Sequence, residues 1–441
     1  MNVLRYAGLL AAGLLVVYPL NAEEIPFDDG VRVAPILQSA RQEAGRAPQS
    51  TLKTSPSVEI VPDMSWVAME DADADAVRQE IDLSRREVLQ QKNGITLIQV
   101  AEVELLHLAD IMHRRRNRCG GFFTYSSKDE ALRELAAPRV KVPVRMYSLG
   151  QPAAVAPMVD RVSEASLRQV ISSLAGFNNR YYKSKDGVAS AEWISSQWKD
   201  LAKGRDDIDV EFYRHDWPQS SVILTVRGTK EPGKILIMGG HADSIAGYWG
   251  GETARAPGAD DNASGIAVLT EALRVIVESG FRPERTIKLI AYAAEEVGLR
   301  GSKDIAADFA ARGVDVVGAV QFDMTLYKGS SKALYFITDN TSAALNSHLG
   351  KLVDRYVKVE WGTTECGYGC SDHASWNSKG YPAAFPFEAE KNGANGNIHS
   401  ARDTLASAGG TAGHAVPFAK LAVAYVVTTS KAGSSQLAHA R

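Results

Sequence analysis

Residues 234–241 read Lys-Ile-Leu-Ile-Met-Gly-Gly-His, an apolar run that ends on an imidazole. The four consecutive apolar residues predict a strand that is buried on both faces. Strands of that kind belong to sheets that helices cover on both sides. In open sheets of this class, ligands bind beyond the carboxyl ends of the strands. His241 therefore stands where a functional side chain is expected.

Strand-like and helix-like segments alternate around this run, which indicates an α/β fold. We expect a mixed, mostly parallel twisted sheet flanked by helices. The expected strands cover residues 221–228, 234–241, 286–293, 317–324 and 333–339. The expected helices cover residues 164–177, 189–202, 262–279, 302–311, 342–357 and 416–427.

The composition excludes several classes of protein. The 441 residues are 45% hydrophobic and 23% charged, and the 37 glycines and 17 prolines are too few for a collagen-like or wholly disordered chain. The 49 basic and 52 acidic residues give a formal net charge of -3, so we expect no nucleic-acid partner. Three cysteines exclude a small scaffold held together by disulfides.

Residues 1–22 have the pattern of a cleavable signal peptide. Arg5 precedes an apolar run from Tyr6 to Leu20, and the small residue Ala22 follows. An uncleaved membrane anchor is the alternative, but a span of the bilayer needs about 20 apolar residues. We therefore expect a secreted or periplasmic protein with no stable membrane association after cleavage.

Residues 23–150 differ in character from the rest of the chain. They contain polar and proline-bearing stretches and an amphipathic segment from Ile95 to Arg116, but no catalytic constellation. We predict a pro-segment that is removed, and the alternative is a permanently attached accessory domain. The basic residues Arg114–Arg116 and Arg118 are a candidate nicking site or a solvated face. Residues 151–430 carry every motif, and residues 431–441 form a short tail.

Polar side chains stand where several expected strands end. His241, the pair Glu295 and Glu296, and Asp323 each close or follow a strand, so we expect them at one edge of the sheet. Two further groups lie at residues 257–265 and at residues 397–400. Each residue alone has an ordinary structural explanation, such as an aspartate that caps a helix. Together their imidazoles and carboxylates suit zinc, and about five donors suggest two metal ions about 3.5 to 4 Å apart.

Four long motifs resemble those of the secreted di-zinc aminopeptidases, close to the bacterial leucyl aminopeptidases. They are His241-Ala-Asp243-Ser, Pro-Gly-Ala-Asp260-Asp261-Asn-Ala-Ser-Gly, Ala-Ala-Glu295-Glu296-Val-Gly-Leu-Arg-Gly-Ser and Gln-Phe-Asp323-Met-Thr. Cys366-Gly-Tyr368-Gly-Cys370-Ser-Asp-His and Ile398-His399 continue the resemblance, which runs from about Val155 to about Thr429. It implies a zinc aminopeptidase fold of the phosphorylase-like type. Residues 23–150 are similar to the inhibitory pro-segments of that family in general plan only.

The resemblance also implies a role for each residue of these motifs. Two Zn²⁺ ions and a shared water would hydrolyse the first peptide bond of substrates with a free N-terminus, with Glu295 as the general base. Tyr368 would donate to the developing oxyanion, with a packed aromatic as its alternative. The family has a cis peptide between its two aspartates, here Asp260 and Asp261. The implied metal ligands are Asp260 as the bridge, His241 and Asp323 on one zinc, and Glu296 and His399 on the other; Asp243 and Asp261 would lie behind them.

Cys366 and Cys370 lie four residues apart in a glycine-containing turn, and in an exported protein they look like a local disulfide that holds Tyr368. Zinc ligation by this pair is the rival interpretation. Cys119 would then remain unpaired. The apolar positions that match the family's substrate pocket, and that have core packing as their alternative, are Met324, Ile337, Phe385, Phe387 and Ile398.

We expect an N-terminal Leu or a similar hydrophobic residue to be removed, by a monomeric enzyme whose pro-segment acts as an inhibitor or chaperone. Residues 390–397 differ from the family pattern: they are polar here, whereas the bacterial leucyl aminopeptidases have aromatic residues at this place. Two alternatives stay open: a related zinc hydrolase of the carboxypeptidase or glutaminyl cyclase type, and a catalytically inactive binding module.

Overall fold

The computed structural model describes residues 63–90, 94–138, 140–149, 152–248, 251–431 and 435–437. The predicted signal peptide and its cleavage near Ala22 lie outside these residues. Among the helices of the described ranges, none combines the length and the apolarity that crossing a membrane requires.

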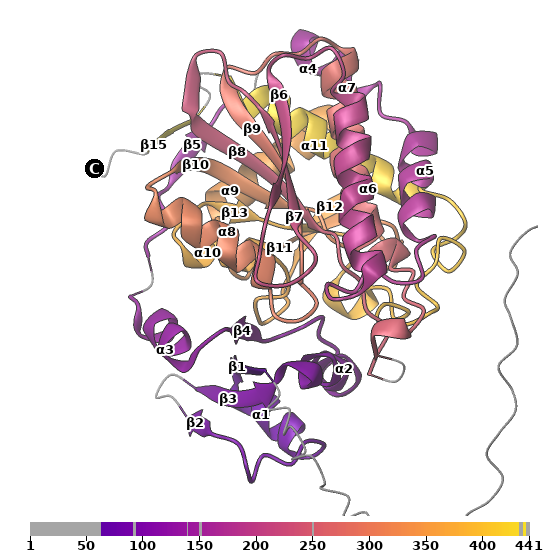
Figure 1. Cartoon of the computed structure of the whole chain (residues 1–441). Helices are drawn as coiled ribbons and strands as arrows, with labels where there is room; N and C mark the ends of the chain where they lie inside the picture. Colours follow the sequence, from indigo (N-terminus) through magenta and orange to yellow (C-terminus); the bar gives the residue numbers. More distant parts are fainter. Residues whose placement is uncertain are drawn as a thin grey trace, which may run out of the picture. The chain divides into compact units, whose positions relative to one another are not determined.

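A six-stranded mixed sheet forms the centre of the C-terminal part of the chain (Figure 1). Its spatial order is β13 (Ala383–Ala384), β10 (Asp315–Gln321), β8 (Glu231–His241), β9 (Arg285–Tyr292), β7 (Ser221–Val226) and β6 (Ile208–Tyr213). The first four strands run parallel to their neighbours, whereas β7 and β6 are antiparallel. The expected mixed, mostly parallel sheet is therefore confirmed, and the carboxyl ends of β8, β9 and β10 lie next to one another.

Helices cover both faces of this sheet because its strands are apolar on both faces. In β8, Leu236 and Met238 pack into one core cluster and Ile237 packs into another, and all three are fully buried. This alternation follows from the two-residue repeat of a strand. The first face carries α5 (Glu164–Leu174), α6 (Lys185–Leu201), α7 (Gly265–Glu278) and α11 (Val416–Thr429), and the second carries α8 (Arg300–Ala311) and α10 (His373–Ser378).

Each expected strand and helix is present, with shifts at its ends. Helix α6 begins at Lys185, four residues before the expected start, because the Ser184 hydroxyl accepts a hydrogen bond from the Gly187 N–H and caps the first turn. The remaining elements of this part are α4 (Pro152–Val159), α9 (Ala343–Leu352) and a three-stranded sheet of β12 (Trp361–Thr364), β11 (Leu334–Ile337) and β14 (Pro386–Phe387). A two-stranded ribbon pairs β5 (Arg145–Tyr147) with β15 (Ser435–Leu437).

Residues 64–136 fold around a four-stranded antiparallel sheet, within the same compact unit as the C-terminal part of the chain. Its strands, in spatial order, are β2 (Val88–Gln90), β3 (Ile95–Ala101), β1 (Met64–Glu70) and β4 (Phe123–Tyr125), and its helices are α1 (Asp71–Arg78), α2 (Leu105–Arg116) and α3 (Lys128–Ala136). Val67, Ile98 and Leu108 are fully buried in its core. We call residues 64–136 the N-terminal domain and residues 152–431 the peptidase-like domain.

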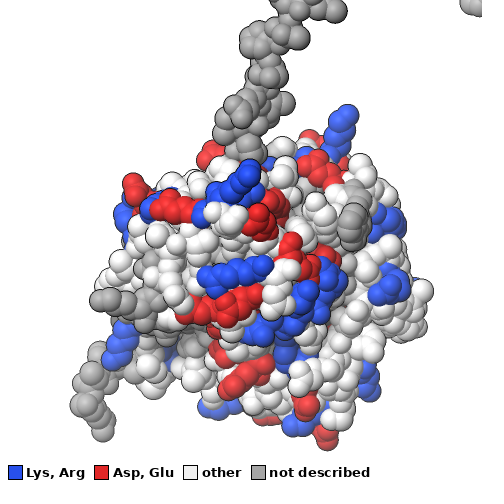
Figure 2. Space-filling view, turned by 90° about the horizontal axis from the view of Figure 1, so that it is seen from below, with Lys and Arg blue, Asp and Glu red and all other residues white. Residues whose placement is uncertain are grey.

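The basic run of the N-terminal domain is paired with acidic residues. Arg114 and Arg115 both contact Glu80, and Arg116 contacts Asp73 at 2.7 Å. Figure 2 shows positive and negative side chains interleaved on the face seen from below. Proteases cut exposed, flexible segments. The helical and ion-paired run therefore favours a solvated face over the candidate nicking site.

Candidate metal centre

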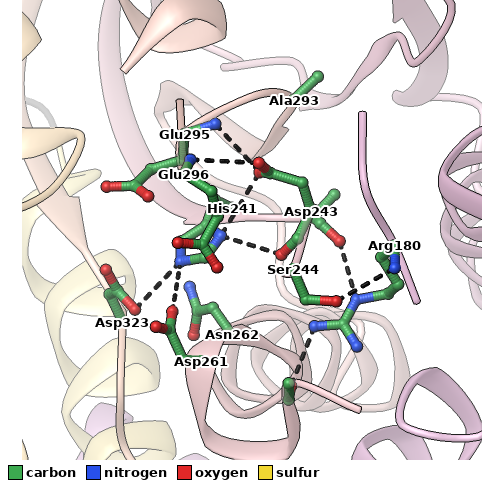
Figure 3. A network of polar contacts seen from close by, with 12 residues as sticks. Arg180, His241, Asp243, Ser244, Asp261, Asn262, Ala293, Glu295, Glu296 and Asp323 are labelled. Atoms are coloured by element: carbon green, nitrogen blue, oxygen red, sulfur yellow. Dashed lines mark hydrogen bonds and ion pairs between the residues drawn. The ribbon is translucent and has the colours of Figure 1, made fainter. Parts of the chain in front are cut away.

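The three parallel strands at the centre of the sheet bring the predicted polar residues to one edge. His241 is the last residue of β8, Glu295 and Glu296 follow β9, and Asp323 follows β10. All four are at most 4% exposed. Figure 3 shows Asp261 and Asp323 on one side of the His241 imidazole and Asp243 on the other. The expectation that these strand ends converge is confirmed.

Asp261 lies between the two imidazoles of the cluster. Its Oδ1 is 2.9 Å from His241 Nε2, and its Oδ2 is 3.3 Å from His399 Nε2. Asp323 Oδ1 is 3.3 Å from the same His241 nitrogen, and Glu296 Oε2 is 2.7 Å from His399 Nε2. The cluster thus has two halves that share one carboxylate.

The carboxylate between the two imidazoles is Asp261, so the structure contradicts the prediction that Asp260 is the shared residue. Asp260 points away from the imidazoles: its Oδ1 accepts a hydrogen bond from Leu326 N–H at 2.9 Å, and its Oδ2 accepts one from the Asn395 amide at 3.0 Å. The cis peptide is likewise one residue further on, between Asp261 and Asn262. From the sequence alone, either of two adjacent aspartates could face the imidazoles, because the backbone conformation decides which side chain points there.

Hydrogen bonds to the backbone and from the following residue fix which aspartate faces the imidazoles. The Asp403 carboxylate accepts from the backbone N–H groups of Asp260 and Asp261, at 3.1 and 3.0 Å. The Asn262 side chain accepts from the N–H of Gly265, the first residue of α7, at 2.8 Å. The backbone of Asp261 and Asn262 is non-helical, which explains why α7 starts at Gly265 and not at residue 262.

Asp243 supports the cluster through the backbone of the glutamate pair. Its Oδ1 accepts from the Glu295 N–H at 3.0 Å and its Oδ2 accepts from the Glu296 N–H at 3.2 Å. The same Oδ1 is 3.5 Å from His241 Nδ1, which is longer than a hydrogen bond. The Asp243 backbone carbonyl lies 3.2 Å from the same His241 nitrogen, so Asp243 contacts the ring through its main chain and the glutamate turn through its carboxylate.

A bend directly after β9 separates the two neighbouring glutamates. Ala294, which precedes them, has a left-handed backbone with φ 56°, and His399 has φ 52°. Such a conformation costs a non-glycine residue roughly 1 to 2 kcal/mol, and functional sites are where this strain is usually found. After this bend the Glu296 carboxylate contacts His399.

The donor atoms of the cluster fit a bound metal. Several buried atoms that face one another lack hydrogen-bond partners among the described residues, and such atoms are costly unless something else satisfies them. They are His241 Nε2, Asp261 Oδ2, Glu296 Oε1 and Oε2, Asp323 Oδ1 and His399 Nε2. Nitrogen and oxygen donors of this kind are those that zinc takes at hydrolytic sites. The residues therefore fit a zinc centre.

The electrostatics point the same way, because the carboxylates outnumber the cations around them. Burial raises the pKa of Glu295 well above its usual range, and burial together with the charge of Asp261 raises the pKa of Glu296 to about 7. Although burial opposes its charge, the carboxylates of Glu296 and Asp261 raise the pKa of His399 to about 10. A site with these shifts favours added positive charge, which a divalent cation supplies.

Tyr368 and its flanking cysteines lie beside the cluster. Cys366 and Cys370 form a disulfide, so that prediction is confirmed and zinc ligation by the pair is excluded. The Tyr368 ring is buried, and its hydroxyl accepts a hydrogen bond from the backbone N–H of Cys119, at 2.9 Å. The disulfide thus closes the turn that carries Tyr368.

The five predicted pocket residues form one apolar cluster together with Tyr368 and Cys370. All five are at most 5% exposed, so their role as core and their role as pocket wall are compatible. They are Met324, Ile337, Phe385, Phe387 and Ile398.

Residues outside the predicted set hold the predicted ones in place. Asp403 caps the Asp260–Asp261 backbone, and Glu388 lies beside Asp260, where burial and the Asp260 charge raise its pKa well above the usual range. The Ser371 hydroxyl donates to Asp323 at 2.7 Å. Asp403 follows His399 by four residues, and this proximity was a signal in the sequence; nothing local marks Glu388.

Comparisons with known proteins show which family this chain resembles. Residues 221–423 match peptidase family M28. A Trichophyton verrucosum protein named as a probable leucine aminopeptidase is 34% identical over 289 residues, 65% of this chain and 78% of that protein. A Saccharomyces cerevisiae protein named as the probable aminopeptidase YDR415C is 36% identical over 256 residues, 56% of this chain and 68% of that protein.

Solved structures extend the similarity beyond the peptidase-like domain. The crystal structure of the Legionella pneumophila LapA aminopeptidase superposes with a TM-score of 0.74 and 28% identity, and covers 84% of this chain and 99% of that chain. LapB of the same organism gives a TM-score of 0.72, with 27% identity, 83% of this chain and 99% of that chain. The matched share of this chain is larger than the share that residues 152–431 represent. Part of the region before residue 152 therefore also has a counterpart in LapA and LapB.

Proposed function

The chain belongs to peptidase family M28 and is a zinc-dependent metallo-aminopeptidase, and we propose that it uses two zinc ions to remove a hydrophobic N-terminal residue from peptides. The observation that carries this proposal is the position of Asp261 between His241 and His399, with unsatisfied buried donors on both sides. A shared carboxylate between two half-sites is the arrangement that two-metal hydrolases require.

Each half of the cluster would hold one metal. His241 and Asp323 belong to one half and Glu296 and His399 to the other, while Asp261 serves both. When bound, the zinc ions supply a water of lowered pKa and polarise the carbonyl of the peptide bond.

Glu295 is the proposed general base. It is buried, next to Glu296, and fixed by its N–H bond to Asp243, so its carboxylate stays at the site without competing for His399. It takes the proton of the attacking water and gives it to the nitrogen of the leaving peptide. Burial raises its pKa, which makes the carboxylate a stronger base, provided that cations at the site keep it ionised.

Tyr368 and the apolar cluster complete the proposed site. The Tyr368 hydroxyl would donate a hydrogen bond to the carbonyl oxygen of the peptide bond as that oxygen becomes negatively charged. The cluster of Met324, Ile337, Phe385 and Phe387 would receive an apolar side chain such as Leu. Residues 390–397 are polar, so we expect the rim of this pocket to be more polar than its apolar interior.

We further propose that the protein is exported by the signal peptide at residues 1–22 and works as a monomer. Residues 23–150 would act as an inhibitor or chaperone of the peptidase-like domain and then be removed. The folded N-terminal domain supports a specific role for this region, because an unstructured linker would not form a buried core.

Metal analysis combined with leucyl-anilide hydrolysis tests the proposal. The protein trimmed to residues 151–441 is expected to bind two zinc ions per chain and to release the anilide, and a chelator is expected to abolish release. One bound zinc, or turnover that survives complete metal removal, would contradict it. Two zinc ions without release from any aminoacyl anilide would point to another substrate class.

A further inference from the structure

The N-terminal domain packs on the loops that carry the catalytic residues. Its α2 residues Leu105 and Leu108 share one core cluster with Tyr182, Ala294 and Val297 of the peptidase-like domain. Ala294 directly precedes Glu295, and Val297 directly follows Glu296. The contact is therefore made at the glutamate turn itself.

Polar contacts fix this packing at two places. Glu102 binds Arg300 and accepts a hydrogen bond from the Tyr182 hydroxyl at 2.9 Å. Thr124 donates its hydroxyl to the Val297 carbonyl at 2.7 Å and its N–H to the Gly298 carbonyl at 3.2 Å. A Cβ on Gly298 would lie 2.4 Å from the Thr124 hydroxyl oxygen, so only glycine permits this approach.

The turn after α2 enters the candidate metal centre. Asn117 and Gly120 have left-handed backbones, with φ 51° and φ 61°, which reverse the chain around Cys119. The Cys119 N–H donates to the Tyr368 hydroxyl at 2.9 Å, and the Arg118 guanidinium lies 4.6 Å from the centre of the Tyr368 ring. Cys119 also packs against the apolar cluster proposed as the substrate pocket.

The side chain of Cys119 joins the donors of one half-site. Its Sγ, a carboxylate oxygen of Asp261 and a ring nitrogen of His399 all lie within 4.8 Å of one another. Asp261 Oδ2 and His399 Nε2 are both buried without a hydrogen-bond partner among the described residues. Sulfur is a strong zinc ligand, and this thiol would add a fourth donor to the half-site of Asp261, Glu296 and His399.

We propose that Cys119 is a ligand of the metal held by Asp261 and His399, and that the N-terminal domain blocks the active site through this bond. The inference rests on the proposed function. Ligation breaks the S–H bond, the proton passes to solvent, and a sulfur lone pair binds the metal without any change of oxidation state. The same turn donates a hydrogen bond to the Tyr368 hydroxyl and packs against the apolar pocket. A substrate therefore cannot enter until the turn has moved away.

Cobalt spectroscopy on the full chain tests this proposal directly. The zinc is replaced by Co²⁺, and the near-ultraviolet band that a thiolate–cobalt bond produces is measured. The wild-type protein is expected to show the band. The variant Cys119→Ser is expected to lose it while keeping the visible bands of bound cobalt, because the other ligands remain.

Thiol reactivity gives a second readout that does not depend on turnover. Cys119 is the only cysteine outside the disulfide, so alkylation in the native state counts it alone. Alkylation is expected to be at least about tenfold slower in the zinc-loaded protein than after chelation, the scale that loss of a metal–ligand bond implies. The control is Cys119→Ser combined with Ser126→Cys, which places a thiol on the exposed surface of the same domain. The alkylation rate of this control is expected to be the same with and without metal.

The outcomes separate the two proposals. Bound cobalt without the near-ultraviolet band, or equal alkylation with and without metal, would overturn the role of Cys119 and leave the proposed function standing. Failure of the full chain to bind metal would overturn the proposed function itself.

Discussion

Two separate variants, which remove the charge of Asp261 or of Asp260, test which of the two aspartates is shared by the proposed metal ions. Asp261→Asn removes a carboxylate that faces both histidines, at 2.9 Å and 3.3 Å. Loss of a residue that only supports a ligand lowers metal affinity about 10- to 100-fold. Loss of a carboxylate common to both half-sites is therefore expected to lower the affinity for both metals by at least about 100-fold.

Asp260→Asn is the matched control, because it removes the same charge one residue away. Both Asp260 oxygens accept hydrogen bonds from buried donors, so the new amide NH₂ must face either Leu326 N–H or the Asn395 amide. One buried donor then loses its partner, at a cost of about 1 to 3 kcal/mol. In a domain of this size each kcal/mol lowers the melting temperature by about 2 to 4 °C.

Zinc titration and thermal unfolding of the trimmed variants distinguish the two. Asp260→Asn is expected to keep two zinc ions and to melt several degrees lower, while Asp261→Asn is expected to lose tight metal binding. A variant Asp261→Asn with two tightly bound zinc ions, or metal loss confined to Asp260→Asn, would refute the reasoning.

Three further predictions concern residues around the centre. Although burial opposes its charge, Arg300 helps to lower the pKa of Glu102 to about 2, so its contribution to stability is complete above its unfolded pKa of about 4.5 and is lost as the pH falls toward 2. Thermal unfolding from pH 6 to pH 2.5 should thus show a smaller acid-induced loss for Glu102→Gln than for the wild type, and parallel curves would argue against this contact. Tyr368→Phe is expected to lower kcat about 100-fold with little change in KM, since only the oxyanion needs the hydroxyl; an unchanged kcat in steady-state assays would remove Tyr368 from the chemistry. Replacing Cys366 and Cys370 by Ser together is expected to cost about 2 kcal/mol in chemical denaturation, from the short loop that the disulfide closes; equal stability would show that the disulfide does not constrain the unfolded chain.

The sequence predicts the sheet and the convergence of its strand ends because both depend on long apolar runs. The run 234–241 predicts a doubly covered strand, and His241, Glu295 and Asp323 follow from its place in a parallel sheet. The disulfide between Cys366 and Cys370 was also predictable, from their spacing.

The choice between Asp260 and Asp261 was not accessible in the same way. It depends on hydrogen bonds that the Asp403 carboxylate, about 140 residues away, accepts from the backbone N–H groups of Asp260 and Asp261, and on the buried pair of Asp260 with Glu388. Hydrophobic periodicity carries no information on such long-range polar contacts.

The N-terminal domain shows a second limit. The stretch from Ile95 to Arg116 has an amphipathic pattern in sequence, and the structure divides it into the strand β3 and the helix α2. The position of Cys119 at the metal centre depends on the packing of two domains. No local pattern reports that packing, so a lone cysteine in the sequence looked unremarkable.

Turnover of Glu295→Gln tests the central claim most directly, because it removes the proposed base and keeps the size of the side chain. Leucyl-anilide hydrolysis by the trimmed protein is measured beside its zinc content. The expected result is a loss of at least about 10³-fold in kcat with two zinc ions still bound. Near-normal turnover at full zinc content would contradict the mechanism.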